Sequence, residues 1–417
     1  MTKFVHAKAG MGETNHTGTP LPMISSARER QPLKDPKDPE EVFALKLDIG
    51  GHGAVLPERE GPTLWLTAGN GFYSLDRSRY ASPVTICMPM STRHALFKLL
   101  ADGAFHSGTA LGERLGISRA AVNKAIQTLA ESGVDIHRVS GRGYRLGEPF
   151  VPLAEGPIQT FIGQRPLQTN QVQTIIEILD EVDSTNEQLL RTAELQSGAS
   201  VCLAEAQSAG RGRRGRAWVA TPGHNILMSM RWRFDTGPAG LAGLSLAAGV
   251  AVLHALEEFG VHDIGLKWPN DILCAGRKLA GLLIDVRGEA SGPSLVVLGL
   301  GLNVFLAPSD GALIDQPWTA LREYLPAGVD RNRLAALLIV HLYEMFCDFE
   351  QYGFTAFQSE WERRHLFHGK AVQLRNVHEV TFGVVEGVDA NGALRVRDAA
   401  GALRSFHSGE VSLRAAH

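Results

Sequence analysis

The sequence predicts a mixed α/β protein in which a helix-turn-helix region precedes, and a small all-β region follows, a central α/β domain. The central region alternates strand-like and helical stretches, residues 91–150 show three short helical patterns and a hairpin pattern, and residues 368–417 show strand patterns alone. A length of 417 residues allows two or three domains, each with its own core.

The composition is that of an ordinary globular protein. Apolar residues make up 44% of the chain, and 41 basic residues nearly balance 44 acidic ones, so the net charge of −3 gives no general attraction to nucleic acid or anionic membranes. The four cysteines lie far apart without zinc-binding spacing, which indicates a reducing compartment and no structural metal. No apolar run approaches the roughly 20 residues of a membrane helix, and no signal-peptide core is present. We therefore expect a cytoplasmic protein with no membrane partner.

Residues 1–90 differ from the rest of the chain. They hold nine of the 20 prolines, and the stretch at 28–41 combines proline with dense charge. Such a segment buries little apolar surface. The sequence therefore predicts a largely disordered N-terminal extension, with a short strand-like patch near residues 64–73.

Residues 91–150 follow a helix-turn-helix pattern. Gly116 separates the second predicted helix from the third, Ser118 is placed to cap the third helix, and Gly133 ends it. Two extended segments joined near Gly141 and Gly143 then predict a hairpin that would form a wing. Apolar residues repeat at helical spacing in the first and third helices: Ala95, Leu96, Leu99 and Leu100, then Val122, Ile126 and Leu129.

The charge of this region favours nucleic-acid binding over a helical domain whose basic residues only maintain solubility. Residues 91–148 contain eight Lys or Arg against five Asp or Glu, a net +3 in a chain of −3, as a phosphate-facing surface requires. Polar side chains point off the third helix and the wing, where bases or phosphates of DNA would lie. They are Arg119, Asn123, Lys124 and Gln127 on the helix, and Arg138, Arg142 and Arg145 on the wing.

The region 165–367 predicts the central sheet. Five segments have the residue types of buried or half-buried strands, at 175–182, 200–206, 225–232, 279–286 and 294–304, and long helical patterns occupy 241–259 and 333–349. Beyond Gly369, strand patterns at 371–375, 381–388, 393–398 and 411–414, with a tight-turn signal at Asn391-Gly392, predict a small barrel.

The segment 204–218 has the most distinctive composition. Glycine lets the backbone approach a ligand closely, and arginine offers forked donors to a carboxylate or phosphate. The spacing is not that of a Walker loop. An anionic-substrate site and an RNA-binding arginine-glycine segment both fit the tract alone, but its place between an apolar strand and Trp218 favours the substrate site. Its glycines and arginines are Gly210, Gly212 and Gly215 with Arg211, Arg213, Arg214 and Arg216.

Three further motifs place polar groups at the ends of predicted elements. Ser184 with Glu187 has the pattern of a capping box, and Ser184, Thr185 and Asn186 also suit a neutral polar ring such as a cyclic urea. Lys267 ends a strand before a proline turn; such a lysine is usually only solvated, but a fixed cation there would assist attack of a carboxylate on a phosphate. The tract GLGLNV at 299–304 lacks the third glycine of a dinucleotide-binding fingerprint.

Taken in order, the motifs DSTN, QxAGRGRxGRxW, KWPND, KLAG and GxGxNV resemble those of biotin protein ligases. Residues 93–150 and the C-terminal region also resemble the winged-helix and SH3-like domains of the bifunctional bacterial members, which repress the biotin operon. Each motif alone is weak, whereas the set is highly specific. The resemblance implies a winged helix-turn-helix domain at 91–150, a catalytic domain of the biotin/lipoate ligase type at 165–367 and an SH3-like domain at 368–417.

The resemblance also implies roles for individual residues. The biotin-binding residues would be Ser184, Thr185, Asn186, Gln207, Gly210, Arg211, Gly212, Arg213 and Lys267. The residues at ATP or the adenylate would be Arg213, Arg214, Arg216, Trp218, Asn270, Asn303 and Trp318, and the catalytic residues would be Lys267, Arg213 and Arg211. Ala217 is a departure, because the best-known repressor-type loop carries a lysine there. We expect loss of that charge either to weaken contacts to phosphate or to alter retention of the adenylate, without abolishing its synthesis.

The implied reaction joins biotin and ATP into biotinyl-5′-adenylate and transfers biotin to a lysine of a biotin carboxyl carrier protein, with Mg²⁺ entering on ATP. Operator DNA is a further implied partner, and a homodimer would form through the strand at 279–286 when the adenylate is bound. A lipoate ligase is one alternative, although its RRxSGGG-type tract is absent. A transcription factor that uses the ligand only as an effector is another.

Overall fold

The computed structural model describes residues 2–14, 20–33, 44–49, 52–57, 63–68, 71–76, 92–131, 134–164, 174–193, 199–325, 328–375, 380–407 and 412–415. The chain divides into two compact units, Met1–Leu96 and Phe97–His417.

The first unit contains six described strands. Four of them pair in the order β2-β1-β3-β4. The other two, β5 and β6, pair with each other and include the expected strand-like patch at residues 64–73. The sequence does not predict the other four strands, and a largely disordered extension at 1–90 stays a prediction. The strands are β1 (Thr2–Thr14), β2 (Pro20–Leu33), β3 (Ala44–Ile49), β4 (His52–Pro57), β5 (Thr63–Ala68) and β6 (Gly71–Asp76).

Residues 92–146 contain the predicted three helices and hairpin. Gly116 ends the second helix with a left-handed φ of 64°, and Ser118 Oγ accepts a hydrogen bond of 3.2 Å from the Ala121 N–H at the start of the third. The predicted helix end at Gly133 lies outside the described residues. The elements are α1 (Thr92–Leu99), α2 (Gly108–Leu115), α3 (Arg119–Glu131), β7 (Ile136–Val139) and β8 (Gly143–Leu146).

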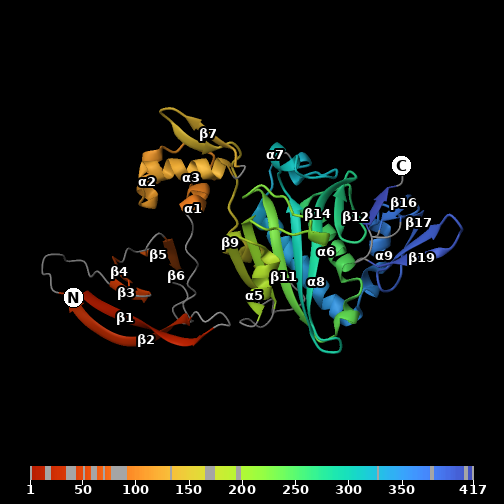
Figure 1. Cartoon of the computed structure of the whole chain (residues 1–417), viewed down its shortest axis with the longest axis horizontal. Helices are drawn as coiled ribbons and strands as arrows, with labels where there is room; N and C mark the ends of the chain where they lie inside the picture. The colour runs from red at the N-terminus through yellow and green to blue at the C-terminus, as the bar shows by residue number, and fades with distance from the viewer. Residues whose placement is uncertain are drawn as a thin grey trace. The chain divides into compact units, whose positions relative to one another are not determined.

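A seven-stranded mixed sheet forms the centre of the second unit (Figure 1). Its order is β12-β13-β14-β15-β11-β10-β9; β9 and β10 are parallel, and every other neighbouring pair is antiparallel. This confirms the mixed α/β class, and β13 is an addition to the predicted strands. The strands are β9 (Ile175–Val182), β10 (Ser200–Gln207), β11 (Asn225–Phe234), β12 (Ile264–Lys267), β13 (Asp271–Cys274), β14 (Arg277–Gly288) and β15 (Ser294–Asn303).

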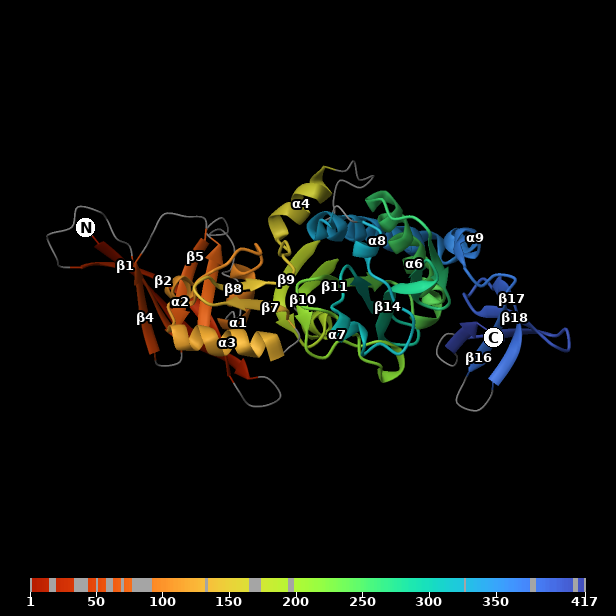
Figure 2. The ribbon, with the colours of Figure 1, turned by 90° about the horizontal axis from the view of Figure 1, so that it is seen from above.

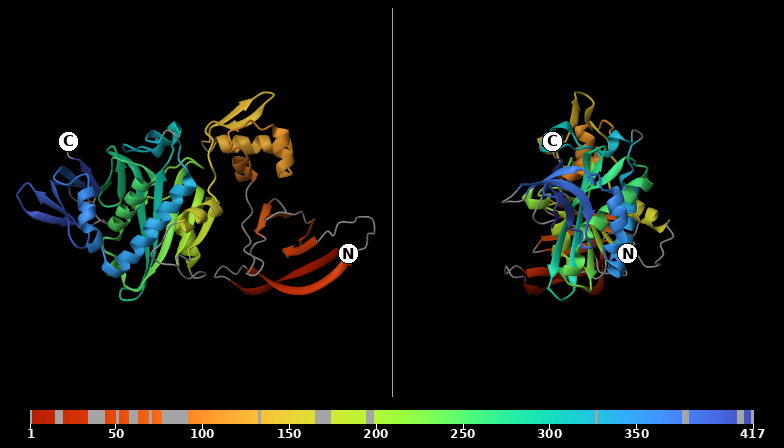
Figure 3. Two further views of the ribbon diagram at one scale, coloured as in Figure 1. Left: turned by 180° about the vertical axis from the view of Figure 1, so that it is seen from behind. Right: turned by 90° about the vertical axis from the view of Figure 1, so that its right-hand side faces the viewer.

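Helices cover both faces of this sheet. α6 (Leu244–Phe259) and α8 (Arg331–Tyr352) lie together on one face, as Figures 2 and 3 show. Along β10, Val201 and Leu203 enter the core with these helices, whereas Cys202 packs on the other face with residues of α5 (Thr185–Arg191). Two further helices, α4 (Glu155–Gly163) and α9 (Thr355–Arg364), also contact α8.

The segment Pro238–Phe259, which includes α6, is the one helical stretch in the described residues that is long and apolar enough to span a membrane. Eleven of the 16 residues of α6 are buried against the sheet and α8. It is therefore a core helix of the central domain.

The C-terminal region is a five-stranded antiparallel sheet in the order β19-β18-β17-β16-β20, with β19 as an addition to the prediction. Its apolar residues, such as Val372 and Leu394, join the core of the central domain, and Trp268 Nε1 donates to the carbonyl of Gly392, 3.1 Å away. The strands are β16 (Ala371–Arg375), β17 (Val380–Val388), β18 (Leu394–Asp398), β19 (Leu403–Phe406) and β20 (Ser412–Ala415).

A buried ion pair holds the segment that enters the central domain from β8. Arg331 Nη2 donates to Glu205 Oε2 over 2.6 Å, and the two side chains are only 3% and 1% exposed. Glu205 Oε1 accepts the Leu153 N–H at 2.7 Å, and Arg331 Nη1 donates to the Val151 carbonyl at 3.3 Å. Because buried charges are stable only when paired and hydrogen-bonded, this pair fixes the path of residues 151–153.

Candidate active site

A cavity of about 840 Å³ is lined by the start of α5, the loop after β10, the β12–β13 turn, β14, β15 and the segment before η5 (Leu321–Glu323). It brings together most residues predicted for the site, although they lie far apart in the sequence. Gly210 and Arg214 are not part of the lining. The predicted residues that line it are Ser184, Thr185, Asn186, Gln207, Arg211, Gly212, Arg213, Arg216, Trp218, Lys267, Asn270, Asn303 and Trp318.

The start of α5 does not form the predicted capping box. Ser184 is the N-cap residue, but its side chain accepts no capping hydrogen bond. Instead, the Thr185 N–H donates to Gln207 Oε1 on β10 over 2.8 Å, and Glu187 pairs with Arg211. The capping-box prediction is therefore wrong: Ser184 makes no cap, and the Glu187 carboxylate that would complete the box is paired with Arg211.

The glycine-arginine loop is a short hairpin in the cavity wall. The Trp218 N–H donates to the Gly210 carbonyl over 2.9 Å, the Gly212 N–H donates to the Arg216 carbonyl over 2.7 Å, and Arg211 pairs with Ala217 between them. Arg214 (φ 59°) and Gly215 (φ 72°) turn the chain at the tip. Ala217 itself lines the cavity, so the missing lysine would have added its charge there.

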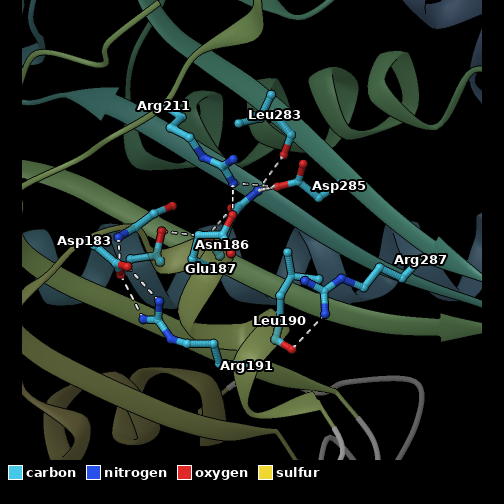
Figure 4. Close-up of polar contacts among 12 residues, drawn as sticks. Asp183, Asn186, Glu187, Leu190, Arg191, Arg211, Leu283, Asp285 and Arg287 are labelled. Carbon is cyan, nitrogen blue, oxygen red and sulfur yellow. Dashed lines mark hydrogen bonds and ion pairs between the residues drawn. The ribbon is translucent and has the colours of Figure 1, made fainter. Parts of the chain in front are cut away.

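Two arginines of this loop are fixed by acceptors from other elements. Arg211 Nη2 lies 2.5 Å from Glu187 Oε1 and 3.5 Å from Asp285 Oδ2, as Figure 4 shows. Arg213 Nη1 donates to Asn270 Oδ1 over 3.3 Å, and burial, with the neighbouring charge of Arg214, lowers its pKa. Both guanidinium groups are thus held in place beside the cavity.

Two lysines line the cavity. Lys267 ends β12, as predicted, with Nζ 5.9 Å from the centre of the Phe367 ring. Lys278 on β14, within the quoted KLAG motif, pairs with Asp271 Oδ1 at 2.7 Å and lies 5.5 Å from the Trp218 ring centre. The sequence predicts no role for Lys278, although the residue lies in the KLAG motif.

The glycines of β15 allow close contacts at the cavity floor. A Cβ at Gly299 would lie 2.2 Å from Asn186 Oδ1, and a Cβ at Gly301 would lie 2.3 Å from the indole of Trp218. Any side chain at either position would displace these groups. The GLGLN tract therefore positions Asn186 and Trp218 rather than forming a phosphate-binding turn.

Two residues of the cavity lining, Asn303 and Trp218, have buried polar atoms without hydrogen-bond partners. The side-chain nitrogen of Asn303 donates to the Thr319 carbonyl over 3.1 Å, but its buried Oδ1 has no hydrogen-bond partner, and neither does the Trp218 Nε1. Buried polar atoms are normally paired, so these two favour a polar ligand at this wall. Trp318 Nε1 donates to the Gly311 carbonyl over 3.1 Å.

Several lining residues were not singled out from the sequence. Asp271 and Lys278 form the ion pair described above, and Gln373 and Arg375 reach the lining from β16. Asp285 is not part of the lining, but it contacts the lining residues Asn186 and Arg211 from β14, and no motif in the sequence marks it. Among the described residues, no group of three or more His, Cys, Asp or Glu side chains could hold a metal ion.

The predicted nucleic-acid surface is exposed on α3 and the hairpin. All four α3 residues are exposed, but Asn123 Oδ1 also accepts the Tyr144 hydroxyl at 3.2 Å, which joins α3 to β8. Arg138 and Arg142 are exposed and Arg145 is half-buried; Arg142 lies 4.2 Å from the centre of the Phe105 ring.

Comparisons with known proteins agree with this architecture. The family model described as Biotin/lipoate A/B protein ligase family matches residues 178–303, an HTH domain model matches 92–145, and a Biotin protein ligase C terminal domain model matches 367–414. The bifunctional ligase/repressor BirA of Salmonella typhimurium is 42% identical over 324 residues, which cover 77% of this chain and 97% of that protein.

Two further relatives align with a little over half of this chain. A biotin--[acetyl-CoA-carboxylase] ligase of Paracoccus denitrificans is 33% identical over 54% of this chain and 95% of its own. The solved biotin protein ligase from Aquifex aeolicus in complex with biotin and ATP has a TM-score of 0.50 and 27% identity, covering 58% of this chain and 99% of that one. The chain therefore belongs to the biotin protein ligase family, together with the bifunctional ligase/repressors.

Proposed function

We propose that the protein is an ATP-dependent biotin protein ligase that forms biotinyl-5′-adenylate and transfers biotin to a lysine of a biotin carboxyl carrier protein. The observation that carries this function is the cavity, which unites the neutral polar start of α5 with the cations Arg211, Arg213, Lys267 and Lys278. The neutral polar groups of α5 can hydrogen-bond to a cyclic urea, and the four cations can offset the negative charge of a carboxylate beside a triphosphate.

In the first step, a carboxylate oxygen of biotin attacks the α-phosphorus of ATP, the bond to the β-phosphate oxygen breaks and pyrophosphate leaves. In the second, the amine of the acceptor lysine attacks the acyl carbon, loses a proton and releases AMP. No side-chain nucleophile is required, so positioning and charge stabilisation carry the catalysis. Mg²⁺ would enter on the triphosphate.

The four cations have distinct proposed roles. Arg211, held beside Asn186, faces the biotin carboxylate, and Arg213, Lys267 and Lys278 offset the charge that develops at the phosphates. Asn303 and Trp318 bind the adenylate and Arg216 contacts phosphate from the loop, whereas Arg214, at the hairpin tip outside the cavity lining, adds only a weaker attraction at longer range. The hairpin of residues 210–218 then shields the labile anhydride from water.

A second function is repression of transcription. The exposed basic residues of α3 and the hairpin, and the named activity of the Salmonella relative, support binding to operator DNA.

A homodimer through β14 is proposed, because β13 pairs with β14 only as far as Gly281. Among the described residues, this leaves 283–288 as an open edge of the sheet. The proposed domains are 91–150, 165–367 and 368–417, in a cytoplasmic protein, and the segment 151–164 packs with the catalytic domain through Leu153 and α4.

The test incubates the purified chain with labelled biotin, Mg-ATP and a biotin carboxyl carrier domain. We expect ATP-dependent label on the carrier, with one AMP and one pyrophosphate per biotin transferred. Competition with lipoate separates this function from that of a lipoate ligase, since excess lipoate should not reduce labelling. DNA binding without any transfer of biotin would instead assign the chain to ligand-responsive transcription factors.

A further inference from the structure

A chain of hydrogen bonds runs from the half-buried Asp285 through buried side chains to the substrate-facing side of α5. Asn186 Nδ2 lies 2.8 Å from Asp285 Oδ2, and Asn186 Oδ1 lies 2.5 Å from Ser229 Oγ. Ser229 Oγ is also 2.6 Å from Thr185 Oγ1, which lines the cavity. Ser229 is fully buried, and Asn186 and Thr185 are 3% and 4% exposed. Figure 4 shows Asn186, at the start of α5, beside Asp285 and Leu283.

The carboxylate at one end fixes the direction of the protons on Asn186 and Ser229. A carboxylate can only accept, so Asn186 must turn its NH₂ toward Asp285 and its carbonyl oxygen toward Ser229. That oxygen also only accepts, so the single Ser229 proton is donated to Asn186. The Thr185 hydroxyl then has two protein acceptors, Ser229 Oγ at 2.6 Å and Gln207 Oε1 at 3.2 Å, and its proton points to one of them. Thr185 Oγ1 consequently presents a lone pair to the cavity.

We propose that Asp285 is a positioning residue for the substrate ring: through Asn186 and Ser229 it makes the Thr185 hydroxyl an acceptor for a ring N–H of the cyclic urea. This inference rests on the proposed function. Asp285 also lies 3.5 Å from Arg211, but that cation is held mainly by Glu187, 2.5 Å away, so the main effect of Asp285 is on the neutral acceptor. A substrate with an N–H at this place is favoured, and a ring without that donor is rejected, because it would leave the acceptor unpaired.

The experiment measures steady-state biotinylation and equilibrium biotin binding in the full chain and in Asp285→Asn and Ser229→Ala. An asparagine at 285 keeps the size of the side chain but can also donate, so the direction of the chain is no longer enforced. For both variants we expect the KM and Kd for biotin to rise about tenfold, as for one lost hydrogen bond in a buried site, with kcat within about twofold of the original. The double variant should lose no more than Ser229→Ala alone, because both changes interrupt one chain.

A matched control is Glu177→Gln. Glu177 on β9 also accepts a side-chain amide of α5, from Gln188 at 3.2 Å, but neither residue lines the cavity. Its KM for biotin should be unchanged. An unmodified chain that fails to ligate biotin would overturn the proposed function itself. An active chain in which Asp285→Asn leaves KM unaltered, lowers only kcat, or adds its loss to that of Ser229→Ala overturns the role of Asp285.

Discussion

The ammonium group of Lys278 lies 2.7 Å from the Asp271 carboxylate, and both groups line the cavity. The side chains are 18% and 15% exposed, so this cation is held in place by its partner. We expect Lys278→Ala to lower kcat/KM for biotinylation by about 100-fold or more, because a fixed cation is lost where phosphate charge develops. Pyrophosphate release measures the effect on the first step.

Lys267→Ala should also depress adenylate formation without unfolding the chain. Lys370→Ala is the matched control, because Lys370 Nζ lies 6.0 Å from the centre of the same Phe367 ring but is not part of the cavity lining. Normal turnover in both the Lys267 and the Lys278 variants would contradict the proposed site.

Arg213→Ala should reduce biotinylation by about 10- to 100-fold. Asn270 holds the Arg213 guanidinium in place, and we propose that this group donates charged hydrogen bonds to the phosphates of ATP. Arg214→Ala should have a much smaller effect, because Arg214 is at the hairpin tip and outside the cavity lining. Thermal melts serve as the folding control. Equal losses in the two variants would favour a general attraction of the loop for anions over a specific contact by Arg213.

The free energy of unfolding should depend on pH through His365. This ring stacks on Trp361 at 4.4 Å between centres, both its nitrogens are buried without hydrogen-bond partners, and burial lowers its pKa to about 3. The unfolded chain therefore binds one more proton between about pH 3 and 6.5, so stability is fully present above 6.5 and is lost as the pH falls. We expect the free energy of unfolding to fall by about 1.4 kcal/mol for each unit by which the pH is lowered near pH 5.

Urea unfolding of the protein and of His365→Phe between pH 4.5 and 7 tests this prediction. His224, whose pKa is also lowered by burial, contributes in the same direction to both proteins and so cancels in the difference. Parallel stability curves for the two proteins would show that His365 does not titrate as described.

Arg119→Ala and Lys124→Ala should weaken binding to operator DNA by about 3- to 10-fold each at low salt and reduce the salt dependence of binding. Both side chains are exposed on α3, and we propose that they contact phosphates or base edges. A gel shift with a candidate biotin-operon promoter, with and without biotin and ATP, measures this. Arg333→Ala, an exposed arginine on α8, is the control. Biotinylation should be unchanged in all three, and an equal loss of DNA binding in Arg333→Ala would argue for non-specific attraction.

Deletion of residues 1–88 should leave biotinylation intact, because every residue that lines the cavity lies in the second unit. The assay compares kcat and KM for biotin in the shortened and full chains. A loss of activity with an unchanged melting temperature would give the extension a direct part in the reaction.

The parts that could be predicted from the sequence are those with a local signal. Val122, Ile126 and Leu129 repeat at helical spacing and are the buried residues of α3, and residues 175–182, which have the residue types of a strand, form β9. Asp285 gave no such signal: its role depends on β14 passing Asn186 and Arg211, which come from other elements. Glu187 shows the opposite error, since a local capping pattern was overridden by a long-range partner, Arg211.

The buried pair of Glu205 and Arg331 has a consequence for dividing the protein into parts. Glu205 Oε1 receives its hydrogen bond from the Leu153 backbone, so a catalytic fragment that begins after this residue would seal a carboxylate oxygen in the interior without its donor. The natural cut between the DNA-binding and catalytic regions therefore lies before Val151. Residues 151–153 belong physically to the enzyme, and any graft of a different N-terminal domain must keep them.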